Sequence, residues 1–269
     1  MKMQFVSLAL AIVTSSAAFA GDNQKALNLL ADAQTAFDGR IDLKQVDIAI
    51  TKATDAEATA DDFEIKYDAK VILARALYFK GIRTSGDKAK MAIFEQSMDR
   101  CKEAIQIDVD NFGDIYAEAH YVFAIALGRW AEAKGVLASL SKKNDLIAAA
   151  EAAQARVTRD GNPGEAYDAY GPARTLGRVY FKLPGFAGGD RGKALALLET
   201  AYANGIENAL NIVYLAEVLA GGSKTDIDRA KTMLDTLLAN DPNTYNPKRV
   251  AETIDEFVLA QDLRRQLGK

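Results

Sequence analysis

The chain of 269 residues is poor in the residues that most often build catalytic and metal centres. It has one cysteine, Cys101, and one histidine, His120. A lone cysteine cannot form a disulfide within the chain, and a lone histidine cannot supply a histidine-based metal cluster or a catalytic triad. The fold must therefore rely on an apolar core, which a chain of this length can bury. We predict no metal ion, no cofactor and no enzymatic activity.

The chain also lacks an excess of positive charge. It carries 33 Lys and Arg against 37 Asp and Glu, a formal net charge of −4. Nucleic-acid-binding domains usually present a strongly basic face, so this balance argues against a nucleic-acid partner.

Long apolar runs are missing, and the one short apolar run lies at the N-terminus. Residues 1–20 combine an early lysine, this run and the sequence Ala18-Phe19-Ala20. The combination is typical of a signal peptide with a small-x-small cleavage site, and the run is shorter than the about 20 residues of a membrane-spanning helix. We predict cleavage before Gly21, export to the periplasm, and a single domain over residues 21–269 without a transmembrane segment. The alternative is a buried N-terminal helix.

Apolar residues recur every three or four positions along most of the chain, as at Ala26, Leu30, Ala33 and Phe37. This spacing places them on one face of a helix, and no segment alternates with period two for long enough to need a sheet. We predict an all-α fold of about five antiparallel helix pairs, stacked as a tetratricopeptide-like α-solenoid. A final helix over residues 246–267 should cap the stack, with these polar residues on its outer face: Lys248, Arg249, Glu252, Asp255, Glu256 and Asp262.

The most informative run covers residues 170–202. Gly171-Pro172 suits the first turn of a helix, because proline there gives up only an amide without an intrahelical partner. Leu176, Gly177 and Tyr180 then follow the large, small, aromatic pattern of the first helix of a tetratricopeptide repeat. Leu127-Gly128 repeats the Leu-Gly pair earlier in the chain, which indicates internal duplication. We therefore expect Gly177 to lie where two helices touch.

A glycine-rich turn of sequence LPGFAGGD separates the two helices of this repeat and is five residues longer than a standard repeat needs. It does not form a phosphate loop, because Ala187 and Ala194 stand where that motif needs glycine and Ser or Thr around Lys193. Either the turn closes over the neighbouring repeat with Arg174 tied into it, or it stands at the rim of a binding face. Its predicted structural residues are Pro184, Gly185, Gly188, Gly189 and Asp190, the last as the N-cap of the next helix.

The pattern G-P-x-R-x-L-G-x-x-Y-x-x-x-P-G-x-x-G-G-D runs from Gly171 to Asp190 and precedes an Ala/Leu-rich helix. It resembles the T component of TRAP transporters, the periplasmic TatT-like helical-repeat proteins, with the similarity densest over residues 115–240. The resemblance implies a ring-shaped oligomer pierced by a pore, and a TRAP-type substrate-binding protein as the partner. Family members typically carry a lipid on a cysteine after the cleavage site, whereas this chain has Gly21.

Arginine and aromatic residues gather on the predicted first helices, which line the concave face of such solenoids. These residue types make effective binding anchors. The alternative is that Trp130 and Tyr180 pack in the core and that the arginines bridge neighbouring helices, the role we assign to Arg174. The candidate binding residues are Tyr121, Arg129, Trp130, Tyr170 and Arg178.

Two functions stay open from the sequence. The first is an exported scaffold that binds a protein partner through its concave surface or central channel. The second is a carrier of small hydrophobic ligands, because a solenoid rich in alanine, leucine and tyrosine can enclose an apolar channel. Cys101 is predicted to be a packed core thiol and His120 a half-buried helix residue.

Overall fold

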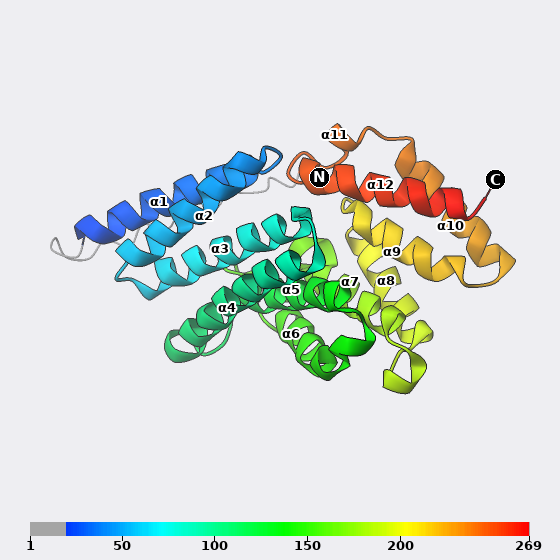
Figure 1. Ribbon diagram of the computed structural model, residues 1–269, viewed down its shortest axis with the longest axis horizontal. Helices are drawn as coiled ribbons and strands as arrows, with labels where there is room; N and C mark the ends of the chain where they lie inside the picture. Colours follow the sequence, from blue (N-terminus) through cyan, green and yellow to red (C-terminus); the bar gives the residue numbers. More distant parts are fainter. Residues whose placement is uncertain (1–19, 269) are drawn as a thin grey trace.

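The computed structural model describes residues 20–268, and no β-strand occurs among them (Figure 1). The all-α prediction is confirmed. The predicted signal peptide lies outside the described residues except for Ala20, with which the first helix begins. The helices form five successive pairs: α1 (Ala20–Asp38) with α2 (Leu43–Thr59), α3 (Phe63–Arg83) with α4 (Asp87–Asn111), α5 (Glu118–Lys134) with α6 (Lys143–Ala155), α7 (Tyr167–Lys182) with α8 (Arg191–Asn204), and α9 (Ala209–Ala220) with α10 (Lys224–Leu238), followed by α11 (Pro242–Tyr245) and α12 (Val250–Gln266).

Short polar side chains decide where many helices begin. The first backbone N–H groups of a helix have no partner within it, and a side-chain oxygen just before the helix can accept their hydrogen bonds. Asp190 does this for α8 by accepting from the backbone N–H of Lys193 at 2.9 Å, so its predicted N-cap role is confirmed. The same role falls to Asp42, Asp62, Asn208 and Ser223 at α2, α3, α9 and α10.

From α1 to α10 each helix packs against the next helix in the sequence, and alanine fills many of the contacts. Cys101 lies in one of the apolar clusters, with Ala74 and Val122, and has no exposed surface. Burial raises the pKa of its thiol. Cys101 is therefore a packed core thiol, as predicted. Between residues 20 and 268, none of the helices combines the length and apolar character that a membrane crossing requires.

The stack does not end as an open rod, because the start of α12 lies beside the turn between α1 and α2 (Figure 1). Arg40, in the turn after α1, donates from Nε and Nη2 to the carboxylate of Glu252 at 2.8 and 2.9 Å. Arg83, at the end of α3, donates to Asp255 at 2.7 Å. The first two pairs and the last helix thus close around the middle of the molecule.

The prediction that the polar residues of the last helix face outward is wrong for three of them, Arg249, Glu252 and Glu256, which are buried or half-buried. Lys248 and Asp255 are exposed, and the partly exposed Asp262 pairs with Arg265. Charged residues elsewhere in the chain hold two of the inward residues: Arg40 pairs with Glu252, and Asp168 with Arg249. The residues that line the internal space are Lys248, Arg249, Glu252, Asp255 and Glu256.

Candidate functional site: the central cavity

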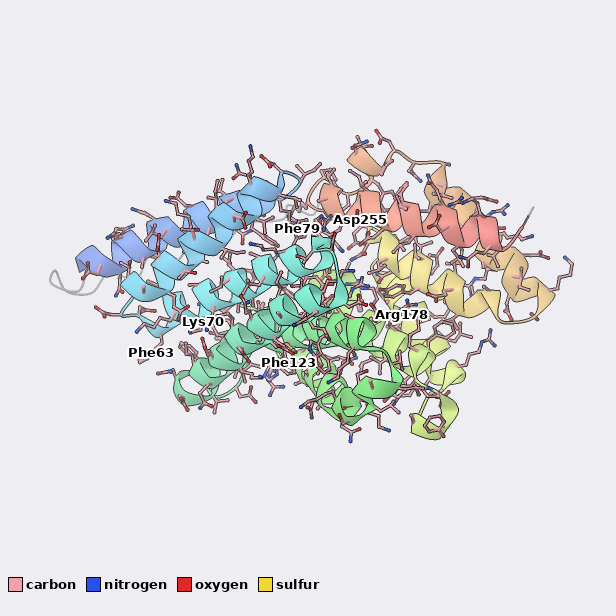
Figure 2. The ribbon with its side chains drawn as sticks, viewed as in Figure 1. Phe63, Lys70, Phe79, Phe123, Arg178 and Asp255 are labelled. Atoms are coloured by element: carbon pink, nitrogen blue, oxygen red, sulfur yellow. The ribbon has the colours of Figure 1, made fainter. Side chains whose placement is uncertain are left out.

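A cavity of about 460 Å³ lies at the centre of the molecule. Its wall comes mainly from α1, α3, α5, α7 and α9, the first helix of each pair, and from α12. Figure 2 labels Phe79 and Asp255 where α3 approaches the start of α12, and Arg178 on α7. Small-molecule sites in proteins typically measure about 300 to 1,000 Å³, so the cavity has the size of a ligand site.

Aromatic rings make up much of the wall. Two of them, Tyr121 and Tyr167, meet edge to face with ring centres 5.3 Å apart. Among the described residues that line the cavity there is no cysteine, serine or histidine. A surface rich in aromatic rings binds apolar groups. The lining rings are Phe37, Tyr78, Phe79, Tyr121, Tyr167 and Tyr214.

Charged residues also reach the cavity, and nearly all of them are paired. Each lining arginine except Arg75 has a carboxylate within 4.0 Å among the described residues. Among the described residues, each acidic residue of the lining except Asp38 has a guanidinium nitrogen of an arginine within 4.0 Å of its carboxylate. The lining arginines are Arg40, Arg75, Arg129, Arg174, Arg178 and Arg249.

The wall contains a strained turn at the start of α7. Asp168, Ala169 and Tyr170 adopt left-handed backbone angles, with φ of 50°, 54° and 60°. Such a conformation costs a residue other than glycine roughly 1–2 kcal/mol. The regular helix begins after this turn, at Gly171-Pro172, where the sequence predicts it. A side chain at Gly171 would collide with the ring of Tyr121.

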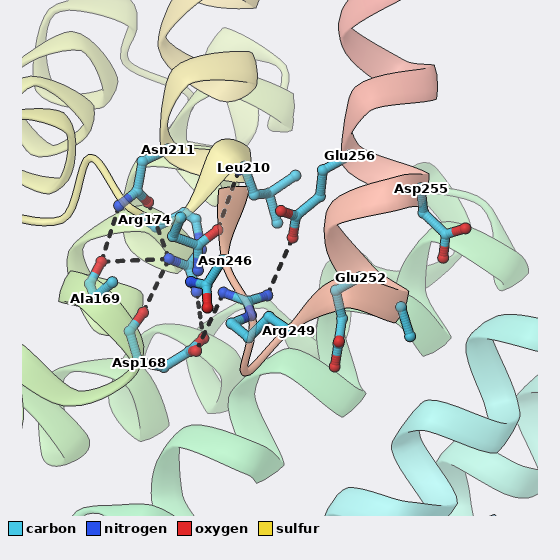
Figure 3. A network of polar contacts seen from close by, with 12 residues as sticks. Asp168, Ala169, Arg174, Leu210, Asn211, Asn246, Arg249, Glu252, Asp255 and Glu256 are labelled. Atoms are coloured by element: carbon cyan, nitrogen blue, oxygen red, sulfur yellow. Dashed lines mark hydrogen bonds and ion pairs between the residues drawn. The ribbon is translucent and has the colours of Figure 1, made fainter. Parts of the chain in front are cut away.

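Buried amide and guanidinium groups hold the left-handed turn in place (Figure 3). Arg174 donates from Nη1 to the carbonyl oxygen of Asp168 at 3.1 Å, and Asn211 donates from Nδ2 to that of Ala169 at 2.9 Å. A Cβ at Gly205 would collide with the same carbonyl of Ala169. Tertiary hydrogen bonds therefore offset the local strain.

Arg174 is the centre of this network and is only 3% exposed. Its Nη2 donates to the Asp168 carboxylate at 2.5 Å and to the Tyr121 hydroxyl at 2.7 Å, and its Nη1 donates to Asn211 at 2.9 Å. Burial by itself would raise the pKa of Asp168, but the cations of Arg249 and Arg174 outweigh it and lower that pKa to about 2. The structural role predicted for Arg174 fits this geometry.

The glycine-rich turn between α7 and α8 closes on its own backbone. The carbonyl of Pro184 accepts hydrogen bonds from Ala187 and Gly189, and any side chain at Gly189 would collide with the carbonyl of Leu183. Gly188 has φ of 93°, a left-handed angle that favours glycine. The carbonyl of Ala187 accepts from the Lys143 ammonium of α6 at 2.6 Å.

The turn therefore packs on the neighbouring repeat, one of the two alternatives from the sequence. The part of that alternative that ties Arg174 into the turn is wrong, because Arg174 bonds at the opposite end of α7. A Cβ at Gly185 would meet no heavy atom within 4 Å, so this glycine is not required by a close contact. Tyr180 accepts from Lys193 at 2.6 Å, which links α7 to the start of α8.

Three of the five predicted binding residues line the cavity: Tyr121, Arg129 and Arg178. Arg129 pairs with Glu132 on the same helix at 2.9 Å. Arg178 pairs with Glu217, and its guanidinium lies 4.3 Å from the centre of the Tyr214 ring. Arg178 therefore bridges α7 and α9 and borders the cavity at the same time.

Trp130 and Tyr170 do not line the cavity. Trp130 packs against a cluster that contains Met98 and donates from Nε1 to Glu95 on α4 at 2.8 Å. Tyr170 belongs to the left-handed turn. Trp130 thus has the packing environment that the alternative interpretation gave it.

Two cavity residues of α3, Arg75 and Tyr78, are not among the residues predicted from the sequence. Both lie in KVILARALYF, which has the pattern of a buried apolar helix. The one signal is Arg75 itself, a charged residue in the middle of an otherwise apolar run. An arginine there needs either a partner or a solvent-filled space.

His120 is half-buried on α5, as predicted, with Nε2 at 3.0 Å from the Asp114 carboxylate. Burial lowers its pKa. In the part of the chain that the structure describes, no group of three or more His, Cys, Asp or Glu residues is placed to hold a metal ion.

No protein-family model matches the chain, and no curated protein is significantly similar to it. The resemblance to the T component of TRAP transporters therefore stays a prediction from the motif between Gly171 and Asp190.

Proposed function

We propose that the protein is a binding protein that holds a small, largely apolar molecule in its central cavity. The cavity is the observation that carries this proposal. It measures about 460 Å³, and the first helix of every pair contributes to its wall. Its lining of aromatic rings with a few polar groups is the composition typical of small-molecule sites.

The wall is built to stay open. Arg174 and Asn211 fix the turn at the start of α7, and the pairs of Arg40 and Arg83 with α12 fix the side opposite. A site that is formed before its ligand arrives loses less entropy on binding. This preformed wall supports a role in holding a ligand.

We further propose that this binding takes place in the periplasm next to a TRAP-type substrate-binding protein, on the strength of the predicted signal peptide and the family resemblance. One structural feature favours a protein partner. Phe186, at the tip of the glycine-rich turn, is 82% exposed, and exposed aromatic rings are effective interface anchors. If so, Phe186→Ser should lower the amount of partner recovered from the cell envelope and leave ligand binding in the cavity unchanged.

A fluorescence titration with the neutral apolar probe N-phenyl-1-naphthylamine tests the cavity. Gly128 lines it, and a Cβ there would meet only the Leu146 side chain, at 3.7 Å. We expect Gly128→Phe to fill part of the space and weaken probe binding at least tenfold, while Gly128→Ala keeps it. Thr175→Trp, on the α7 side of the same space, should act like Gly128→Phe.

Thermal unfolding of each variant shows that the fold is retained. If the folded Gly128→Phe and Thr175→Trp variants bind the probe as tightly as the wild type, the cavity is not the binding site and the proposal fails.

A further inference from the structure

Among the described residues, one arginine of the cavity wall, Arg75, has no charged partner. The side chain of Arg75 makes no hydrogen bond and no ion pair with any residue between 20 and 268. One face of its guanidinium lies over the Phe37 ring, with 4.8 Å from Cζ to the ring centre. Arg75 is half-buried and lines the cavity.

The contrast with the other lining arginines makes Arg75 informative. Arg40, for example, uses Nε and Nη2 on Glu252 and Nη1 on the carbonyl of Phe37. The one lining acid without an arginine partner among the described residues, Asp38, is exposed and accepts from Gln34 at 2.7 Å. Arg75 is therefore the one lining arginine that no carboxylate of the described residues pairs with.

A second polar group of the cavity wall is Tyr167. The hydroxyl of Tyr167 also has no hydrogen-bond partner in the described chain, and its ring is fixed edge-on against Tyr121. Burial raises the pKa of Tyr167 to about 12, and the charge of Arg75 acts on it in the opposite direction. The hydroxyl therefore stays protonated at neutral pH and can donate a hydrogen bond.

We infer that Arg75 and Tyr167 form the polar end of the binding cavity and select a ligand with one negatively charged oxyanion, such as a carboxylate or sulfonate, on an apolar aromatic or branched body. The planar guanidinium can give two parallel hydrogen bonds to such a group, and the tyrosine hydroxyl a third. The rings of Tyr78 and Phe37 then face the apolar body. This inference rests on the proposed function, because it assigns the ligand of the same cavity.

Two probes with the same apolar body separate charge recognition from apolar binding. 8-Anilinonaphthalene-1-sulfonate carries one negative charge, and N-phenyl-1-naphthylamine is its neutral counterpart. A charge-assisted hydrogen bond in a partly buried site is worth about a ten- to hundredfold change in Kd. We expect Arg75→Met to weaken binding of the sulfonate by that factor and binding of the neutral probe by less than about twofold.

Two further variants control for charge and shape. Lys80→Met removes one positive charge from the same helix outside the cavity, where Lys80 pairs with Asp47 at 2.8 Å, and should leave both probes unchanged. Arg75→Lys keeps the charge without the planar donor pair and should restore part of the sulfonate binding. Tyr167→Phe should weaken the sulfonate alone, by a smaller factor.

The outcomes separate this inference from the proposed function. If Gly128→Phe abolishes binding of both probes but Arg75→Met affects them equally, or Lys80→Met copies its effect, the cavity binds ligands and the anion inference is overturned. If Gly128→Phe affects neither probe, the proposed function itself fails. Selective loss of the sulfonate in Arg75→Met, with an unchanged melting temperature, supports the inference.

Discussion

The Leu-Gly pairs at residues 127–128 and 176–177 are identical in sequence and opposite in surroundings. Gly177 on α7 lies against α8, where a Cβ would come within 2.7 Å of Leu198 and 3.2 Å of the carbonyl of Ala194. Gly128 on α5 borders the cavity, where a Cβ would meet only Leu146 at 3.7 Å. The first glycine lets two helices touch, and the second leaves space between them.

The same difference separates two arginines on α7. Arg174 is buried in a network of hydrogen bonds, whereas Arg178 borders the cavity and shares its partner Glu217 with Lys182. A sequence motif thus shows which positions carry a small or a positively charged residue, but it does not show what each of these residues contacts. The contacts depend on how the helices are arranged around the cavity.

Alanine substitution of these two arginines should give the largest difference in the free energy of unfolding between the packed region and the cavity wall. Removal of Arg174 leaves the half-buried Asp168 beside fewer cations and frees the carbonyls of the strained turn. Loss of one partner of a buried ion pair typically costs about 3–5 kcal/mol, and Arg174 itself is buried. Arg178→Ala leaves Glu217 paired with Lys182 at 2.6 Å and should cost about 1 kcal/mol. Urea unfolding of both alanine variants measures this. Equal losses would mean that Arg178 is as structural as Arg174.

The glycine pair should give the next largest difference. Gly177→Leu forces α7 away from α8, and overpacking of this kind costs about 3 kcal/mol at the upper end of its usual range. Gly128→Leu has the cavity to occupy and should stay within about 1 kcal/mol of the wild type, below the usual range for overpacking. The melting temperatures of the two variants test this. Gly185→Leu, at a position without neighbours, is the control for a leucine on the surface.

The packed region should also lose stability in acid. The pKa of Asp168 is about 2 in the folded protein against an ordinary value of 3.8, so its contribution is present above pH 4 and is lost as the pH falls from 4 to 2. The difference corresponds to about 2 kcal/mol. Asp168→Asn should therefore have a smaller fall in unfolding free energy between pH 4 and 2 than the wild type.

The exposed pair of Asp235 with Arg264 gives the control for this acid effect. Asp235→Asn should keep the fall seen in the wild type. A wild-type profile that matches Asp168→Asn would show that Asp168 is not held ionised by Arg249 and Arg174.

The smallest expected effect is a gain. Gly128→Ala removes a flexible residue from the interior of α5 without a close contact, so helix propensity should raise the free energy of unfolding by up to about 1 kcal/mol. The same substitution at Gly177 should lower it, because its Cβ meets Leu198 at 2.7 Å. Chemical denaturation resolves the opposite signs, and a loss in both variants would remove the distinction between the two glycines.

Local chemistry makes much of the fold predictable. The period of the apolar residues indicates the helices, Asp190 marks the start of α8, and Gly177 marks a helix contact. Arg174 can be assigned a structural role because it belongs to the same motif. The first three features depend on neighbours a few residues apart or on one adjacent helix, whereas Arg174 also bonds to Tyr121 on α5 and Asn211 on α9.

The cavity depends on contacts that no local pattern encodes. The polar residues of α12 have the spacing of a solvent-facing surface, but Glu252 and Asp255 meet Arg40 and Arg83 from the first two pairs. Arg75 cannot be identified as a binding residue from the sequence for the same reason. Its importance comes from a missing partner, which only the closed arrangement of the helices shows.

A crystal structure of the protein with 6-bromo-2-naphthoate, an aromatic carboxylate that carries bromine, tests the central claim most directly. The anomalous signal of bromine locates the ligand independently of its shape. We predict one bromine peak inside the cavity between α3, α5 and α7, with the carboxylate turned toward Arg75. Bromine peaks confined to the outer surface, with the cavity free of ligand at saturating concentration, would contradict the claim that this cavity is the binding site.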